Sequence, residues 1–326
     1  MKIVSGIRPT GQLHLGNYLG AIRNWIPLQE HHDCLFFIAD LHALTTHHGE
    51  SLYHTSLDTA AIYLACGINP GTIFIQSHIP EHSELSWILS CHTPLGWLNR
   101  MTQFKEKSAK NQDTSMLGLL AYPVLMAADV LLYHATHVPV GEDQKQHVEL
   151  MRDIALSMNH HYKAEIFTIP EPLIQTFGAR IMSLRDGTAK MGKSNASDFE
   201  RINLWDSNDL IRDKIKKATS DPLPLPSHVD ELENRKETAN LLTIYALSTN
   251  ISLEDAIAQF SGHGFSSFKK ALTEALITLI EPIREKILIY TQDKSALEGL
   301  LTKGATHARQ KAFQTLMTVK ETIKLR

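Results

Sequence analysis

Short, continuous apolar runs alternate with stretches of helical periodicity over the first two thirds of the chain. The runs at 34–39 and 72–76 have the length and composition of buried strands of a sheet, and the short run at 2–7 is a further plausible strand. Apolar residues spaced three to four apart predict helices between them, over 15–26, 52–66 and 83–90. This alternation predicts an α/β fold with a Rossmann-like parallel sheet covered by helices on both faces.

The middle of the chain holds an almost wholly apolar segment, 117–133, whose single charged residue is Asp129. A carboxylate in an apolar helix is costly to bury without a donor, so we expect Asp129 either to reach solvent or to await a ligand. A strand at 137–140 and a helix running to residue 158 follow. The segment 179–184 is predicted to be the last strand of the sheet.

Beyond residue 195 the pattern becomes helical. Predicted helices cover 209–217, 237–247, 253–259, 267–290 and 306–324, and a proline-rich loop covers 222–226. We therefore expect an α/β nucleotide-binding domain over 1–194, a helical domain over 195–290 and a C-terminal helical segment over 291–326.

Bulk composition narrows the class of protein. A chain of 326 residues with a net charge of -3 has room for two domains, and any contact with nucleic acid must be a local patch. Cys34, Cys66 and Cys91 are odd in number and widely spaced, which favours reduced thiols. Without a signal peptide or a membrane-spanning apolar run, the expected location is cytoplasmic, with no membrane partner. No H-E-x-x-H or C-x-x-C motif occurs, so no metal site is predicted.

The turn after the first predicted strand contains widely spaced glycines at a helix start, where phosphate binds well. It is not a P-loop, because Asn17 and Tyr18 stand where Lys and Ser/Thr are required. The glycines are also too far apart for a dinucleotide fingerprint. What remains is the quartet 14–17, His-Leu-Gly-Asn, whose imidazole and amide can donate to phosphates; the alternative is a surface turn with a satisfied histidine.

Four further features carry possible chemistry. The basic run 104–110 is a phosphate contact or a solvated charge run, and 188–194 brings two lysines into a glycine-bearing loop. The acidic residues of 141–144 either accept from ribose hydroxyls or simply suit a helix N-terminus. His42, just after the second strand, is a pocket residue or a helix-capping or solvent histidine.

Three motifs in order carry a resemblance to a known family. His-Leu-Gly-Asn at 14–17 resembles the HIGH signature of class I aminoacyl-tRNA synthetases, with Asn in the last place as in their tryptophan-specific branch. Gly-Glu-Asp-Gln at 141–144 and Lys-Met-Gly-Lys-Ser at 190–194, the latter similar to KMSKS, follow in the expected order. With 101–108 and 138–147, the similarity to the bacterial tryptophanyl-tRNA synthetases extends over nearly the whole chain.

The resemblance implies the activation of L-tryptophan with ATP and Mg²⁺ and its transfer to tRNA(Trp). It also implies a homodimer, a helical domain that reads the anticodon and a last segment that packs back near the catalytic domain. The reaction needs no general base, because the substrate carboxylate is already ionised at neutral pH. Catalysis then consists of positioning and positive charge around the phosphates.

By the same resemblance, site residues fall into three groups. The catalytic residues are Lys193, Lys190, Lys107, His14 and Asn17. The ATP-binding residues are Arg8, Pro9, Thr10, Gly16, Asn17, Gly141, Glu142, Asp143, Ile181, Lys190, Met191, Gly192, Lys193 and Ser194. The tryptophan-binding residues are Asp129, Met126, His42, Val4, Val130 and Val138. Asp129 accepts from the indole N–H, which only donates, while Met126 packs on the ring.

Two departures from the family pattern stand out. Gly192 replaces the middle serine of KMSKS, and Arg8 stands where Gln is frequent. Two alternatives remain open: a tyrosyl-tRNA synthetase, which Met126 disfavours because a phenolic hydroxyl is usually gripped by Gln and Asp, and a non-catalytic relative that only binds RNA or an amino acid. Such relatives usually lose the signature lysines, and both lysines are present.

Overall fold

A five-stranded parallel sheet forms the centre of the computed structural model, which describes residues 1–46, 51–102, 116–141, 144–174, 180–193 and 197–325. Its strands are β1 (Lys2–Ile7), β2 (Asp33–Ile38), β3 (Ile73–Ile75), β4 (His137–Val140) and β5 (Glu171–Ile174). The spatial order is β3-β2-β1-β4-β5, so the chain starts in the middle, moves outward to β3 and then returns to the other side of β1. The direction of winding therefore switches between β1 and β4, where open α/β sheets bind ligands.

The first four predicted strands are confirmed, but the fifth was wrong. The last strand is Glu171–Ile174, which pairs with β4. In the segment predicted instead, Met182 makes only an isolated antiparallel bridge to Lys190. The true strand lies at the sheet edge and begins with Glu171 and Pro172, so it does not stand out in a search for apolar runs.

Helices cover both faces of the sheet. In the first half of the chain they are α1 (Leu15–Asn17), the π-helical η1 (Tyr18–Ile22), α2 (Arg23–His31), α3 (Asp40–Ala43), α4 (Leu52–Ala65), α5 (Glu81–Ser90), α6 (Leu95–Asn99), α8 (Leu117–Leu131) and α9 (Lys145–Tyr162), with short 3₁₀ turns η2 (Pro70–Thr72) and η3 (Gln76–His78). Alternate strand residues point to opposite faces, so Phe36 stacks on Trp25 at 4.7 Å while Phe37 stacks on Phe74 at 5.9 Å. Two apolar clusters result, one on each face.

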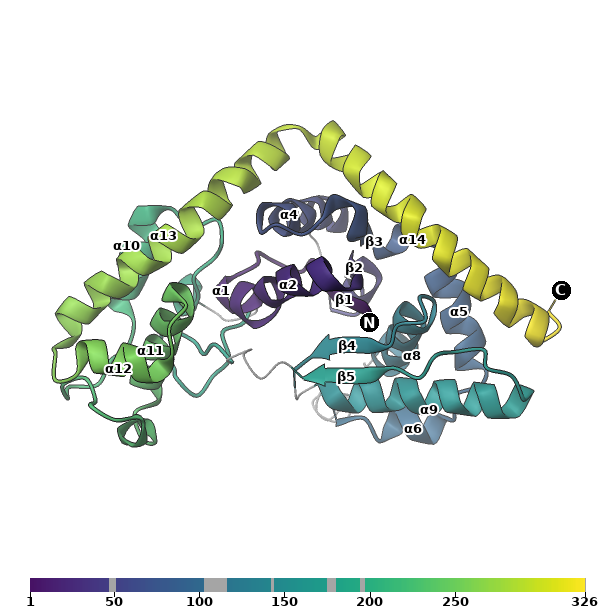
Figure 1. Ribbon diagram of the computed structural model, residues 1–326, viewed down its shortest axis with the longest axis horizontal. Coiled ribbons are helices and arrows are strands. Elements are labelled where there is room, and N and C mark those ends of the chain that lie inside the picture. The colour runs from purple at the N-terminus through teal and green to yellow at the C-terminus, as the bar shows by residue number, and fades with distance from the viewer. Residues whose placement is uncertain (47–50, 103–115, 142–143, 175–179, 194–196, 326) are drawn as a thin grey trace.

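The second half is helical, as predicted. Its elements are η6 (Asp198–Glu200), α10 (Asn208–Lys217), η7 (Val229–Leu232), α11 (Lys236–Thr249), α12 (Leu253–Phe260), α13 (Phe265–Gln292) and α14 (Lys294–Thr322). The final helix starts twelve residues before the predicted start, with the Asp293 side chain accepting from the Ala296 backbone N–H. In Figure 1, α13 and α14 form the two arms of an inverted V, with α4 beneath the apex. No helix within the described ranges is both long and apolar enough to cross a membrane.

The α14 helix approaches the sheet edge very closely. A Cβ atom at Gly304 would lie only 1.9 Å from the Ile73 carbonyl oxygen, a distance that no side chain tolerates. Leu297 and Leu301 of α14 belong to one apolar cluster, while Ala308 and Ala312 belong to the other. Small residues therefore let α14 lie against the edge strand β3 and join the two cores.

Candidate active site

The turn between β1 and α1, residues 8–14, is called the opening turn here. Backbone hydrogen bonds hold it against a distant part of the chain. The Leu15 backbone N–H donates to the Ile202 carbonyl at 2.8 Å, and the Leu204 N–H donates to the Leu13 carbonyl at 3.1 Å. Asn17 uses its amide oxygen locally, as acceptor of the His14 backbone N–H at 3.1 Å. The Asn17 side-chain N–H₂ group therefore remains the donor that this residue can offer a ligand.

His14 is 3 % exposed, and within the described residues its Nδ1 has no hydrogen-bond partner. Burial, with the nearby charges of Lys193, Arg201 and Lys190, lowers the pKa of His14 to about 3, so the imidazole is neutral at pH 7. A Cβ at Gly16 would lie 3.1 Å from the His14 ring and 3.6 Å from the Ile181 side chain. The absence of a side chain at Gly16 therefore keeps the His14 ring and Ile181 close to the turn.

The loop that carries Lys190 and Lys193, called the lysine loop here, lies against the opening turn. Lys193 donates from Nζ to the Arg8 carbonyl oxygen at 2.9 Å. Burial, followed by the Arg8 charge, lowers the pKa of Lys193 to about 7. Met191 is buried, and its N–H donates to the Ile181 carbonyl at 3.0 Å, which makes a hairpin of the loop's first half.

The structure therefore brings Arg8, His14, Gly16, Ile181 and Lys193 together. Lys190 lies opposite Met182 in the same hairpin, near enough to influence His14. Pro9 is buried, Thr10 and Gly192 are partly buried, and Gly141 is exposed directly after β4. Lys107, Glu142, Asp143 and Ser194 fall outside the described residues.

A network of ion pairs that contacts the lysine loop was not predicted from the sequence. Arg201 reaches the carbonyl oxygens of Gly192 and Lys193, at 3.5 and 3.4 Å, and pairs with Asp198 at 3.2 Å. Asp198 in turn contacts Lys214, whose side chain is wholly buried and 2.6 Å from Asp206. The only sequence signal was that α10 is basic, which does not distinguish a buried lysine from solvated ones.

Asp129 corrects the expectation formed from its sequence context. It is fully buried, so it does not reach solvent, and it already has partners without a ligand. Three donors surround the carboxylate: Gln76 Nε2 at 2.6 Å, and His82 Nδ1 and His42 Nε2, each at 2.7 Å. Burial raises the pKa of Asp129, but the charge and hydrogen bonds of His42 and the contacts of His82 outweigh it and bring the pKa down to about 2.

Four of the other predicted pocket residues share one apolar cluster. Val4, Val130 and Val138 are buried in one apolar cluster, and Met126 packs against that cluster while remaining partly exposed. His42 is 8 % exposed, which places it between the core and the surface.

Four polar residues around this pocket were missed as site residues. They are Gln76, His82, Tyr122 and His147. The Tyr122 hydroxyl is 2.9 Å from His147 Nε2, and its ring meets that of His42 edge-on at 6.2 Å. Nothing in the local sequence of His82 points to Asp129, because the two residues lie 47 positions apart along the chain.

The two halves of the site adjoin at the carboxyl ends of the strands. Arg8 follows β1, His42 follows β2, Gln76 follows β3 and Gly141 follows β4. Tyr122 links the halves: burial raises its pKa to about 12, and the Arg8 charge acts on it in the opposite direction. A cationic turn and a buried carboxylate are therefore both held by residues that follow the carboxyl ends of the strands.

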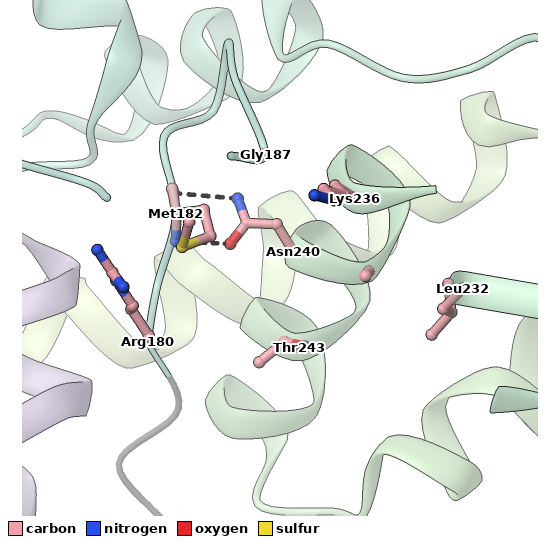
Figure 2. A pocket seen from close by; sticks show the side chains of 8 residues that line it. Arg180, Met182, Gly187, Leu232, Lys236, Asn240 and Thr243 are labelled. Atoms are coloured by element: carbon pink, nitrogen blue, oxygen red, sulfur yellow. Dashed lines mark hydrogen bonds between the residues drawn. The ribbon is translucent and has the colours of Figure 1, made fainter. Parts of the chain in front are cut away.

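Two cavities lie near the lysine loop. One, of about 730 Å³, lies between α4 and the opening turn, and of the predicted ATP residues only Lys193 lines it. The other, of about 200 Å³, lies at the base of the hairpin (Figure 2), where Asn240 of α11 accepts from the Met182 N–H at 2.9 Å and donates to its carbonyl at 3.0 Å. Arg180 and Lys236 line this smaller cavity on opposite sides of the Asn240–Met182 pair.

Comparison with known proteins gives consistent relatives. The profile of the family described as tRNA synthetases class I (W and Y) matches residues 1–281. The tryptophan–tRNA ligase of Rickettsia conorii is 53 % identical over 322 residues, covering 98 % of this chain and 97 % of that protein. The crystal structure of tryptophanyl-tRNA synthetase from Mycoplasma pneumoniae superposes with a TM-score of 0.89 at 33 % identity, covering 100 % and 98 % of the two chains. The Campylobacter jejuni enzyme, solved with ADP and tryptophan, has a TM-score of 0.84 at 37 % identity, with 99 % and 100 % covered.

Proposed function

The chain belongs to the class I tRNA synthetases of the tryptophan and tyrosine type, and we propose how its residues divide the work of a tryptophan–tRNA ligase. The activity has two steps: L-tryptophan and ATP give tryptophanyl-adenylate and pyrophosphate, and the tryptophanyl group then passes to tRNA(Trp). One feature of the site supports these roles. A cationic turn and a buried carboxylate both lie where strands of the sheet end.

In the first step, a carboxylate oxygen of tryptophan attacks the α-phosphorus of ATP. The bond from that phosphorus to the bridging oxygen breaks, pyrophosphate leaves with the electron pair, and no proton moves. Lys193 and Lys190 offset the charge that grows on the leaving group, and Lys107 is assigned the same role from the earlier basic loop. His14 and Asn17 donate to the phosphates, and Mg²⁺ enters with ATP as part of the substrate.

The unpartnered Nδ1 of His14 supports this arrangement. A buried polar atom without a partner is costly, and a phosphate oxygen beside it supplies the missing hydrogen bond. We place the rest of the nucleotide along Arg8, Pro9, Thr10, Gly16, Ile181 and the 190–194 loop, with the ribose at Gly141, Glu142 and Asp143. Gly192 then keeps that loop flexible between its two lysines.

Tryptophan lies on the other half of the site. Asp129 accepts from the indole N–H, Met126 packs on the ring, and His42, Val4, Val130 and Val138 complete the pocket. A phenylalanine ring leaves the buried acceptor without its donor, which is a strong ground for rejection.

Several wider assignments follow from family membership and remain part of the proposal. Residues 1–194 form the catalytic domain, 195–290 read the anticodon of tRNA(Trp), and 291–326 pack back near the catalytic domain. The enzyme works as a homodimer in the cytoplasm, where its tRNA substrate is found. Light scattering of the purified protein tests the dimer, and a mass matching one chain would reject it.

Amino-acid-dependent exchange of pyrophosphate into ATP tests the function directly. Purified protein is expected to exchange only when tryptophan is supplied, with tyrosine and phenylalanine as the comparison amino acids. Equal exchange with tyrosine would reject the pocket assignment. Binding of ATP without exchange for any amino acid would instead identify a non-catalytic binding protein.

A further inference from the structure

We propose that Gln76, His82 and Tyr133 are positioning residues that leave only the Oδ2 atom of Asp129 free to accept the indole N–H. The inference rests on the proposed function, because it takes Asp129 as the contact of the tryptophan ring. It adds which oxygen makes the contact, and which residues outside the pocket set the preference for a ring that carries an N–H.

The two oxygens of Asp129 differ in what they already bind. Oδ1 accepts from Gln76 Nε2 at 2.6 Å and from His82 Nδ1 at 2.7 Å. A carboxylate oxygen offers two lone-pair directions, so Oδ1 is fully used. Among the described residues, Oδ2 accepts only from His42 Nε2 at 2.7 Å, which leaves one direction open. A ring that donates a single N–H matches that one open position.

Each donor to Oδ1 is itself held in one orientation. The oxygen of the Gln76 amide accepts from the Leu41 backbone N–H at 3.2 Å, so the amide cannot rotate without losing that bond. The Tyr133 hydroxyl lies 2.7 Å from His82 Nε2. Burial, with the nearby charges of Asp129 and Glu81, raises the pKa of Tyr133 well above its usual value, so Tyr133 stays neutral and its O–H can donate a hydrogen bond to His82 Nε2. With Nε2 as the acceptor, the ring hydrogen of neutral His82 is on Nδ1, and this N–H donates the hydrogen bond to Asp129 Oδ1.

The surroundings exclude water from this chain of bonds. His82 is 0 % exposed, and its ring centroid lies 6.1 Å from that of Phe37, 5.9 Å from Phe74 and 5.5 Å from Tyr133. Water cannot replace a donor lost from such a place, so the carboxylate would turn or take a new partner. His42, with its 8 % exposure, lies instead at the pocket side and shares Oδ2 with the guest.

The test compares tryptophan with its benzothienyl analogue, in which sulfur replaces the ring N–H. The readout is the ratio of kcat/KM for the two amino acids in pyrophosphate exchange, because a general loss of folded enzyme cancels from this ratio. The parent protein is expected to prefer tryptophan by about 100-fold or more, since the analogue leaves a buried acceptor unpaired. Asp129→Asn, which changes the acceptor itself, is expected to abolish most of that preference.

His82→Leu is expected to reduce the preference about tenfold, because the carboxylate is no longer held with Oδ2 toward the ring. His82→Asn should recover part of it, since an asparagine amide can donate from near the Nδ1 position. Tyr133→Phe, which removes one oxygen atom, is expected to give a reduction of about threefold. Tyr162→Phe is the matched control: the Tyr162 hydroxyl also meets a histidine, His92 Nε2 at 3.0 Å, but that pair has no bond to Asp129.

An unchanged ratio in His82→Leu and Tyr133→Phe, with both amino acids slowed equally, would overturn the inference, because the residues would then be only structural. If His82→Leu does not fold, Tyr133→Phe measured against Tyr162→Phe decides the question. A parent protein that exchanges with no amino acid rejects the proposed function instead. Collapse of the ratio in Asp129→Asn alone would leave that function standing and remove only the positioning role.

Discussion

The two halves of the site are built on opposite principles. In the half that we propose binds the phosphates, Lys193 pairs with no carboxylate and His14 Nδ1 has no hydrogen-bond partner within the described residues, so positive charge and hydrogen-bonding capacity are left for a ligand. In the half that we propose binds the indole, Asp129 already accepts hydrogen bonds from three side-chain donors of the protein itself. Lys193 in the first half has no carboxylate partner within the described residues, whereas the carboxylate of the second half already has its hydrogen-bond donors.

This difference follows from what each half must do. Charge appears on the pyrophosphate during the reaction, so donors that gain a partner only at that point lower the barrier. The indole does not react, so the pocket only has to recognise it, and a rigid acceptor does that best. The two halves also differ in secondary structure. The phosphate half consists of turns and a hairpin, whereas the indole half lies in the core between strand ends and α8.

The largest effect is expected from removing charge on the phosphate half. Lys193→Ala should lower kcat for pyrophosphate exchange about 100- to 1,000-fold, because one preorganised cation is lost at the leaving group. The KM for tryptophan should stay nearly constant, since the indole half is untouched. Lys303→Ala, on the exposed face of α14, is the control and should match the parent protein. A rise in the tryptophan KM equal to the fall in kcat would contradict the separation of the two halves.

Asp129→Ala should act on the other half. Loss of the acceptor is expected to raise the KM for tryptophan about 100-fold while leaving the KM for ATP nearly constant. The three donors that lose their partner should also lower the free energy of unfolding by about 3 kcal/mol, measured by urea denaturation. Asp209→Ala, whose side chain is 94 % exposed, serves as the control. Equal losses of affinity for both substrates would show that the carboxylate is structural.

The same contrast explains how far the sequence could predict the site. The strands β2 and β3 and the helix of Asp129 were predictable, because burial leaves apolar runs in the sequence. The residues that satisfy Asp129 were not, since His42, Gln76 and His82 lie 87, 53 and 47 positions away along the chain. A continuous apolar run marks a buried strand locally, whereas a hydrogen-bond network is a property of the folded chain. The edge strand Glu171–Ile174 was missed because it is partly exposed and includes a glutamate and a proline, so it leaves no apolar run in the sequence.

A substitution in α14 should have a smaller effect, and it should weaken tryptophan binding but not ATP binding. Gly304→Ala brings a methyl group against the Ile73 carbonyl and should lower the free energy of unfolding by about 1–3 kcal/mol. Ile73 begins β3, and the end of β3 delivers Gln76 to Asp129, so the KM for tryptophan should rise while that for ATP does not. Gly299→Ala, in the same helix with open space at its Cβ, should instead stabilise the protein by about 0.5–1 kcal/mol. A larger change in ATP binding than in tryptophan binding would contradict this dependence.

The smallest expected effect is the uptake of a proton by Lys193 when ATP binds. With a pKa of about 7, most Lys193 side chains are uncharged at pH 8 in the free protein, and the phosphates of ATP favour the charged form. Binding of ATP at pH 8 should therefore take up nearly one proton, and affinity should fall as the pH rises above 7 by up to about tenfold per unit. Calorimetry in buffers of different ionisation enthalpy measures this uptake, and it should vanish in Lys193→Arg, whose guanidinium is always charged.

Undiminished uptake in Lys193→Arg would assign the proton to another group and remove the link between burial of Lys193 and phosphate binding. The indole half supplies the internal comparison, because Asp129, with a pKa of about 2, is already ionised at any pH of interest. Its contact with the ring should exchange no proton. A phosphate half that gains a proton beside an indole half that gains none is therefore the result expected when charge is left unused in one place and already satisfied in the other.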